Sequence, residues 1–135
     1  MIVELVSVGT ELLLGNIVNT NTQYLAEQCA LLGLSLYHQS VVGDNHDRMA
    51  EVVKTALGRS DVVILTGGLG PTEDDLTKEV CAEVMGYKLV EDPHTREHLE
   101  QFFKNNIYKE IPDNNWKQAM VPEGALVLDN HNGMA

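Results

Sequence analysis

Three short apolar segments, each followed by a helical pattern, constrain the fold of this 135-residue chain more than any other feature. The segments are residues 2–8, 34–42 and 61–66, and a glycine follows each of them directly. Runs of this kind, rich in β-branched residues and closed by a turn signal, are typical of buried strands in a parallel sheet. We therefore predict three parallel strands in the first half of the chain.

The segments after these strands carry apolar side chains at the spacing of an amphipathic helix. They are residues 20–32, 49–57 and 77–85, and each is followed by a glycine that would stop the helix. In the first, Leu25, Cys29 and Leu32 share one face. Alternating strands and helices with right-handed crossovers predict an α/β fold, in which helices cover both faces of a mainly parallel sheet.

The last third of the chain is less regular. Asp92-Pro93 is an N-cap followed by a proline at the first helical position, so a helix is expected to begin there and to end near Asn105-Asn106. Residues 114–119 are expected to form a short helix, and residues 125–128 one more strand. Residues 132–135 are turn-like. With no repeat or linker in the chain, we expect a single domain over residues 1–135.

The composition excludes several classes of function. Acidic residues outnumber basic ones by 20 to 9, giving a formal net charge of -11, which argues against a nucleic-acid partner. There is no signal peptide and no apolar run of membrane-spanning length, so we expect a cytoplasmic protein with no membrane partner. Cys29 and Cys81 lie in helical patterns, and we expect buried thiols rather than a disulfide or a zinc site.

The loops after the three strands carry most of the unusual residues. In open α/β sheets, ligands bind beyond the carboxyl ends of the strands, which is where residues 9–21, 43–45 and 66–77 would lie. The third loop has three glycines before a helix start and could offer backbone N–H groups to an anion. Its local sequence is equally compatible with a simple strand-to-helix turn, in which Thr72 is the N-cap and Asp75 completes a capping box.

The same loop contains three successive acids, Glu73, Asp74 and Asp75. They favour the helix dipole, which is one explanation for them. A phosphate here would also meet Glu11 and Asp44 at neighbouring strand ends, and each like-charge contact at about 4 Å costs about 4 kcal/mol. An anionic ligand therefore needs a divalent cation held by these carboxylates. The alternative is that no anion binds and the acids form a solvated face.

The histidines indicate no metal site. They are scattered, only His94 and His98 share a helical i, i+4 spacing, and neither the glutamate nor the third ligand of a zinc motif accompanies them. We interpret them as surface residues. The glycine loop also lacks the endings of a P-loop and of a dinucleotide fingerprint, and no serine-hydrolase elbow is present.

Several of these segments together resemble one protein family. Residues 9–15, 19–21 and 42–45, and above all the sequence Thr-Gly-Gly-Leu-Gly-Pro-Thr-Glu-Asp-Asp-Leu-Thr at 66–77, are similar to the N-terminal domain of the CinA competence/damage-inducible family. Residues 115–119 and 122–124 match the same family, so the resemblance covers essentially the whole chain. That domain belongs to the wider molybdopterin-binding, MoaB/MogA-like superfamily.

The resemblance implies a fold and an activity. The fold is a three-layer α/β/α arrangement, and the activity is metal-dependent hydrolysis of the pyrophosphate bond of ADP-ribose to AMP and ribose 5-phosphate. A non-hydrolytic molybdopterin- or nucleotide-binding module is the alternative, and an oligomerisation scaffold with a vestigial loop is a third possibility. The family's deamidase domain has no counterpart here, and the C-terminal end of the family's first domain is expected to be missing. We also expect a homo-oligomer, either a dimer or a trimer.

The resemblance also implies a set of site residues. The two functional aspartates of the superfamily fall on Asp44 and Asp75, and Glu11, Asp74 and Lys117 are pocket candidates. We expect Asp75, with Asp74 or Asp44, to hold the metal. Glu11 would deprotonate a water, and Lys117 would neutralise charge on the leaving phosphate. The metal's identity is left open. The further pocket candidates are Thr10, Asn16, Asn21, Gly67, Gly68, Gly70 and Gln118.

Overall fold

The computed structural model describes residues 1–105, 111–130 and 132, which form two compact units. The first unit spans residues 1–68 and the second residues 69–135. Each unit is described below by itself.

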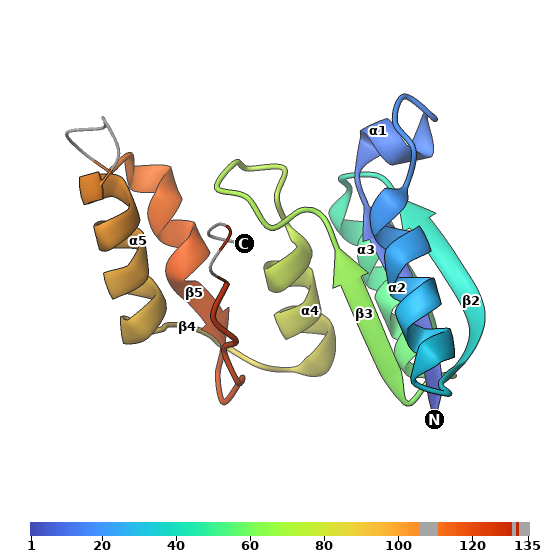
Figure 1. The fold of residues 1–135 in the computed structure, drawn as a ribbon. Helices are drawn as coiled ribbons and strands as arrows, with labels where there is room; N and C mark the ends of the chain where they lie inside the picture. The colour runs from blue at the N-terminus through green and yellow to red at the C-terminus, as the bar shows by residue number, and fades with distance from the viewer. Residues whose placement is uncertain (106–110, 131, 133–135) are drawn as a thin grey trace. The chain divides into compact units, whose positions relative to one another are not determined.

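The first unit is built on a parallel sheet of three strands (Figure 1). Strand β1, Ile2–Val8, is central, and it pairs with β2, Ser35–Val42, on one side and with β3, Val62–Thr66, on the other. A register shift between Val3 and Glu4 marks a bulge in the pairing of β1 with β2. The three predicted strands and their parallel orientation are confirmed.

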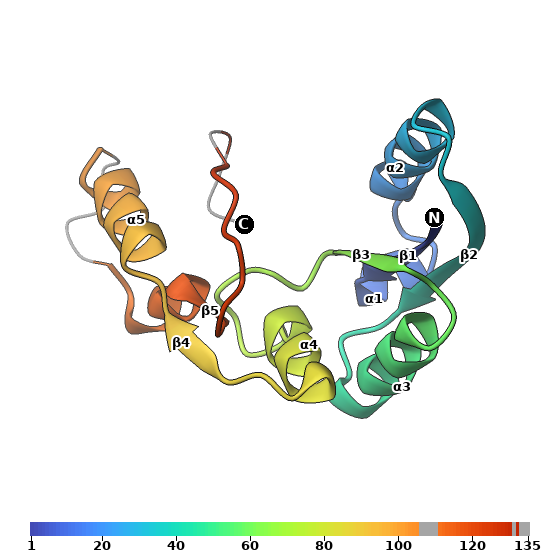
Figure 2. The ribbon, with the colours of Figure 1, turned by 90° about the horizontal axis from the view of Figure 1, so that it is seen from below.

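Helices cover both faces of this sheet, as Figure 2 shows for α2, Thr20–Leu31, and α3, His46–Leu57. Successive side chains of a strand point to opposite faces, so β1 supplies both sides of the core. Val3 and Leu5 pack with Cys29 of α2. The alternate β1 side chains lie on the other face, where α3 buries three residues: Met49, Val53 and Ala56. The predicted three-layer α/β/α arrangement is therefore confirmed.

Two details of the first unit differ from the prediction. Leu32 is exposed rather than packed beside Cys29, because α2 ends at Leu31 and Leu32 is its C-cap. A short helix, α1, spans Thr10–Leu13 and was not predicted. A helix of one turn is too short to show a periodic apolar pattern.

A partly buried ion pair joins Glu4 of β1 to the exposed Arg59, and the sequence gives no sign of it. The Glu4 side chain is 1% exposed, and its carboxylate accepts hydrogen bonds from Arg59 Nε at 2.8 Å and Nη2 at 2.7 Å. Ser60 Oγ donates a weaker bond at 3.3 Å. The hydrogen bonds from Arg59 outweigh the effect of burial and hold the pKa of Glu4 below its usual value. Glu4 is therefore buried as a carboxylate.

We expect Arg59→Met to destabilise the first unit in a pH-dependent way. A carboxylate with a lowered pKa contributes stability above its unfolded pKa of about 4.3, and this contribution is lost as the pH falls through the folded pKa. Without Arg59, the buried charge of Glu4 is uncompensated at neutral pH. The variant should therefore melt about 5 °C or more below the parent at pH 7, measured by thermal unfolding, and the difference should shrink toward pH 3.

Lys54→Met is the matched control, because Lys54 is an exposed cation of α3 outside this ion pair. It removes the same charge and should change the melting temperature little at any pH. A difference between Arg59→Met and the parent that is equally large at pH 7 and pH 3 would contradict the assignment of the effect to Glu4.

The second unit contains α4, β4, α5, a 3-10 helix η1 and β5. Helix α4 is Thr77–Met85 and ends at Gly86, which has φ +75°, and helix α5 is Pro93–Asn105. Strands β4, Leu89–Glu91, and β5, Met120–Pro122, pair antiparallel, and η1 is Asp113–Ala119. The predicted helices at 77–85, 93–105 and 114–119 are confirmed, the last as a 3-10 helix. The short β4–β5 pair was not predicted.

The N-terminus of α5 has the predicted cap. Asp92 Oδ2 accepts hydrogen bonds from the Thr95 backbone N–H and from Thr95 Oγ1, both at 2.7 Å. Further along the helix Leu99 is fully buried, and the Arg96 guanidinium lies 4.3 Å from the centroid of the Trp116 ring of η1. This contact, together with the buried Leu99, packs η1 against α5.

The predicted strand at 125–128 is wrong. After β5 the chain turns at Gly124, which has φ +81°, and residues 125–128 join no ladder in the described part of the chain. Leu126 and Leu128 are exposed, so this apolar run was not a sign of burial. Asn106 at the expected end of α5, His131, and the turn-like residues 133–135 lie outside the described residues.

Within the described residues, no helix combines the length and apolar character needed to cross a membrane. Both cysteines are free thiols, Cys29 buried and Cys81 half-buried. Burial raises the pKa of the Cys81 thiol. The interpretation of the two cysteines as thiols rather than a disulfide is confirmed.

Candidate functional site

In the first unit, a cavity of about 150 Å³ opens at the carboxyl ends of β1 and β3. We call it the strand-end cavity. Its lining includes Glu11, Leu12, Ile17, Val18, Asn21 and Gly67. The fold thus gathers three of the predicted site residues: Glu11 from the segment of residues 10–13, Asn21 from α2, and Gly67 from the loop after β3.

Asp44 and Thr10 form a reciprocal pair in the same unit. The Thr10 backbone N–H and Oγ1 donate to Asp44 Oδ2 at 3.0 and 2.8 Å, and the Asp44 backbone N–H donates to Thr10 Oγ1 at 3.2 Å. These bonds tie the loop after β2 to the first residue of α1. One oxygen of Asp44 is therefore used to hold the fold, and Asp44 does not line the strand-end cavity.

A polar network around Asn19, which also lines the cavity, was not predicted. Asn19 caps α2 by accepting from the Thr22 backbone N–H at 3.1 Å, and its Nδ2 donates to Ser7 Oγ at 2.8 Å. The hydroxyls of Ser7 and Thr22, both buried, are 2.8 Å apart. An asparagine directly before a helical pattern is an N-cap signal that could have identified Asn19. Beside it, Asn21 Nδ2 donates to Thr66 Oγ1 at 3.0 Å, which joins α2 to the end of β3.

The carboxylate of Glu11 differs from the other acids of this unit. It is exposed at the cavity and has no hydrogen-bond partner among the described residues. It folds back over Gly9, where a Cβ atom would lie 2.6 Å from Glu11 Oε1. The predicted pocket residue Asn16 is exposed, and its backbone N–H donates to the Glu11 carbonyl oxygen at 2.9 Å.

In the second unit, Asp75 is held in place by hydrogen bonds from Thr72, unlike the neighbouring acids Glu73 and Asp74, which are exposed. Its Oδ2 accepts from the Thr72 backbone N–H at 2.9 Å and from Thr72 Oγ1 at 2.5 Å. A Cβ on Gly70 would lie 2.7 Å from the same oxygen, so a larger residue there would displace the Asp75 carboxylate. Burial alone would raise the pKa of Asp75, but hydrogen bonds from Thr72 and the Gly70 backbone, together with the charge of Lys117, lower it. Asp75 is held as a carboxylate.

The predicted capping box is only half present. Asp75 reaches back to the Thr72 backbone N–H as expected, but α4 begins at Thr77 with Leu76 as its N-cap, so Thr72 does not cap that helix. The physical reason is that the Thr72 hydroxyl donates to Asp75 instead of accepting from a helical N–H. The pair therefore closes a turn over residues 72–75 that precedes the helix.

Lys117 is bound to the backbone of that turn. Its Nζ donates to the carbonyl oxygens of Thr72, at 2.9 Å, and Asp75, and lies 3.4 Å from Glu79 Oε1. Lys78 Nζ donates in turn to the carbonyls of Lys117 at 3.2 Å and Gln118 at 2.9 Å. Gln118 thus contributes its backbone, and burial lowers the pKa of Lys78. Lys117 therefore fastens η1 to the turn over residues 72–75, and Lys78 fastens η1 to α4.

A divalent ion in this loop would need oxygen ligands from the bound ligand as well as from the protein. The described residues contain no group of three His, Cys, Asp or Glu side chains that could hold a metal. Magnesium-like ions are held by one or two carboxylates together with phosphate oxygens and water. Asp75 and the exposed Asp74 offer oxygen ligands of that kind, so the residues fit an ion that is completed by the ligand.

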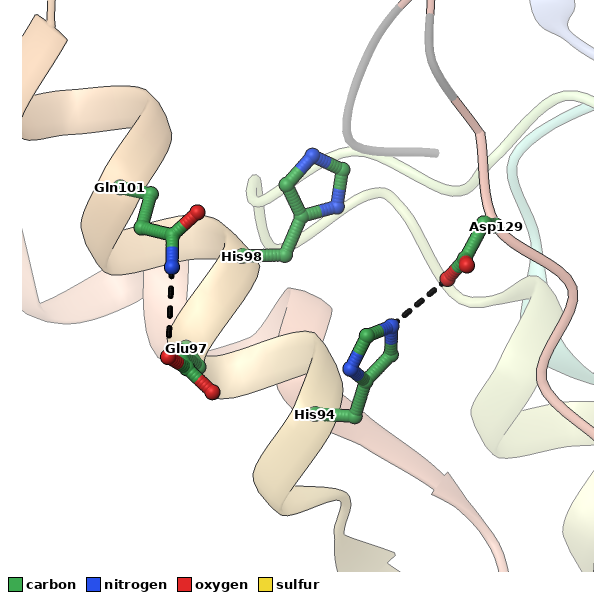
Figure 3. A pocket seen from close by; sticks show the side chains of 5 residues that line it. All are labelled: His94, Glu97, His98, Gln101 and Asp129. Atoms are coloured by element: carbon green, nitrogen blue, oxygen red, sulfur yellow. Dashed lines mark hydrogen bonds and ion pairs between the residues drawn. The ribbon is translucent and has the colours of Figure 1, made fainter.

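A larger cavity, of about 230 Å³, lies along α5 (Figure 3). His94 Nε2 lies 2.7 Å from Asp129 Oδ1, and His98, Glu97 and Gln101 complete the lining. The hydrogen bond to Asp129 raises the pKa of His94. His94 is exposed and His98 half-buried, and neither joins a metal-binding group among the described residues.

Known proteins match this chain over nearly its whole length. Residues 4–131 match the family described as "Probable molybdopterin binding domain". A competence-damage inducible protein of Alkaliphilus oremlandii is 52% identical over 132 residues, which are 98% of this chain and 32% of that protein. A protein of the same name from Symbiobacterium thermophilum is 56% identical over 135 residues, 100% of this chain and 32% of that protein. The chain therefore spans about a third of the length of these relatives.

Solved structures agree with this assignment. The CinA protein of Thermoplasma acidophilum, described as of unknown function, has a TM-score of 0.91 and 29% identity, covering 99% of this chain and 78% of that one. The molybdopterin biosynthesis enzyme MoaB of Thermus thermophilus has a TM-score of 0.58 and 17% identity, covering 90% and 78%, which indicates a shared fold. The chain belongs to the molybdopterin-binding domain family, and over nearly its whole length it is similar to competence-damage inducible proteins and to CinA.

Proposed function

We propose that this domain hydrolyses the pyrophosphate bond of ADP-ribose to AMP and ribose 5-phosphate with the help of a divalent ion. The observation that carries the proposal is the state of Asp75. Its pKa is lowered, and Thr72 and the Gly70 backbone fix its position in the loop that follows the glycines. A carboxylate kept ionised and fixed in place is suited to hold a cation beside a diphosphate.

The glycine loop supplies backbone N–H groups that can bind the diphosphate. In the proposed complex the backbone N–H groups of Leu69 and Gly70 bind the diphosphate, while Asp75 and Asp74 hold the ion. When bound, the ion supplies the positive charge that a diphosphate needs beside the acids of residues 73–75. Without it, each contact between like charges at about 4 Å would cost about 4 kcal/mol.

Lys117 has a different role in this proposal from neutralising a leaving phosphate. Its ammonium group is already bound to two carbonyl oxygens of the acidic turn and lies near Glu79. It therefore acts as a positioning residue that holds the turn and lowers the pKa of Asp75 through its charge. The neutralising charge at the diphosphate is then left to the ion.

The decisive experiment is to incubate the protein with ADP-ribose and, in separate reactions, Mg²⁺, Mn²⁺ or Co²⁺, and to measure AMP. We expect AMP to form with at least one ion, to stop when a chelator is in excess, and to resume when the ion is restored. Full activity in excess chelator would exclude the ion from the mechanism. Absence of AMP with every ion would contradict the hydrolytic function.

A binding module without hydrolysis is the second candidate. It is favoured by the family description and by the structural likeness to MoaB. Calorimetry with ADP-ribose and with a pterin ligand separates the two candidates, because a module of this kind would bind a ligand without releasing AMP.

A further inference from the structure

We propose that the strand-end cavity binds the uncharged nucleoside part of the ligand, and that Glu11 recognises its hydroxyl or amino groups instead of acting as the general base. The proposal rests on the proposed function for its ligand class, a nucleotide. It assigns to the first unit a recognition role that is separate from phosphate binding.

The volume of the cavity limits what it can hold. At about 150 Å³ it is comparable to an engineered cavity that holds one benzene molecule. A whole dinucleotide cannot fit in that space. One ring of a ligand can, whether a ribose or a nucleobase, while the rest of the ligand stays outside the cavity.

The charge of the lining selects an uncharged group. Glu11 is the one ionisable side chain among the described residues that line the cavity, and no lysine, arginine or histidine joins it. A phosphate about 4 Å from this carboxylate would be disfavoured by about 4 kcal/mol. The cavity is therefore unsuited to the diphosphate, which we have proposed to bind at the glycine loop.

The polar groups of the lining favour hydrogen-bond donors on the ligand. The Glu11 carboxylate has no partner among the described residues, so both of its oxygens are available to accept. Asn21 uses one N–H of its Nδ2 on Thr66 Oγ1, and its amide oxygen remains as a further acceptor for a ligand. Ribose hydroxyls and exocyclic amines are the donors that nucleosides present.

The apolar side of the lining fits the face of a ring. Ile17 and Val18 are 53% and 80% exposed, although each borders the cavity together with Leu12. A ring bound there would cover part of this exposed apolar surface, which is favourable by roughly 25 cal/mol per Å². A carboxylate opposite apolar side chains is thus matched to a flat ligand with polar edges.

The test uses adenosine, which has no phosphate, and pyrophosphate, which has no nucleoside. By calorimetry, the parent protein is expected to bind adenosine, and Glu11→Gln is expected to weaken that binding about ten-fold or more, since a hydrogen bond to a charged acceptor is lost. Pyrophosphate binding, measured with Mg²⁺, should be unchanged or tighter in the variant. Because the Glu11 carboxylate has no hydrogen-bond partner among the described residues, its substitution by glutamine should leave the melting temperature unchanged.

Glu27→Gln is the matched control. Glu27 is an exposed acid of α2 whose side chain accepts only from Gln23, at 3.3 Å, and its loss should change neither affinity.

Adenine and 2′,3′-dideoxyadenosine, tested in parallel, distinguish recognition of the base from recognition of the ribose. Where turnover is measurable, Glu11→Gln should raise KM with little change in kcat, whereas loss of a general base would lower kcat.

Failure of this inference is distinguishable from failure of the proposed function. Adenosine that does not bind, or that binds equally well to Glu11→Gln, overturns the inference even if ADP-ribose is hydrolysed. A variant that loses pyrophosphate but keeps adenosine overturns it too. Absence of AMP formation contradicts only the proposed function, since adenosine binding requires no turnover.

Discussion

Replacing Asp75 by asparagine is expected to reduce the turnover of ADP-ribose at least about 100-fold while the fold survives. The asparagine carbonyl oxygen can still accept from the Thr72 backbone N–H and hydroxyl, which now lie 2.9 and 2.5 Å from Asp75 Oδ2, so the turn over residues 72–75 is retained. The negative charge is lost, and with it a cation ligand. Losses of this size are typical when a catalytic constellation is no longer held in place. Initial rates of AMP formation at saturating ion, together with thermal unfolding, measure both effects.

Thr72→Val separates the turn from the charge. It removes the hydroxyl bond to Asp75 and keeps the backbone bond and the carboxylate, so it should retain most of the turnover at neutral pH. The hydroxyl bond lowers the pKa of Asp75, and removing it raises that pKa. The fall in activity on acidification should therefore begin at a higher pH in Thr72→Val than in the parent. Near-normal turnover of Asp75→Asn at saturating ion would refute the ligand role.

The sequence predicts the strands of the first unit because their signals are local and repeated. Apolar runs that end at glycines predict strands, and β1, β2 and β3 lie within one residue of the predicted boundaries. The Glu4–Arg59 pair could not be predicted, because its members are 55 residues apart and a single acid in an apolar strand carries no partner information. Strands β4 and β5 have three residues each, too few to show the alternation on which strand prediction depends.

Some features of the candidate site could also be predicted from the sequence, and others could not. The contact of Asp75 with the Thr72 backbone follows from a three-residue spacing, and the sequence predicted it. The position of Lys117 depends on the path of η1 from residue 113 to 119, and its choice of backbone carbonyls as partners has no counterpart in sequence spacing. The strand-end cavity required the pairing of β1 with β3, which alone places the ends of those two strands side by side.

Gly67 is the residue of the first unit whose replacement is expected to be most damaging. Its φ is +92°, in the region that favours glycine, and a Cβ atom there would lie 2.0 Å from the Val8 carbonyl oxygen. No real Cβ approaches a backbone atom so closely, and Val8 is fixed in the central strand of the sheet. The glycine after β3 is thus required by packing against β1, apart from any role in ligand binding.

We expect Gly67→Ala to lower the free energy of unfolding of the first unit by more than about 4 kcal/mol, because either β1 or β3 must shift to admit the methyl group. In thermal unfolding this corresponds to a melting temperature lower by roughly 15 °C or more. The strand-end cavity should be distorted as well, since Val8 and Gly67 both line it.

Gly33→Ala isolates the contribution of the backbone conformation. Gly33 has φ +70°, but nothing lies within 4 Å of a Cβ placed there, so the substitution imposes the unfavourable φ without the steric clash. Its cost should be about 1 to 2 kcal/mol, the usual penalty for a left-handed conformation. If the two alanine variants melted at the same temperature, the close approach of Gly67 to Val8 would not limit the stability of the sheet. A gap of roughly 10 °C between them would assign the difference to that contact, since both variants carry the same change in backbone preference.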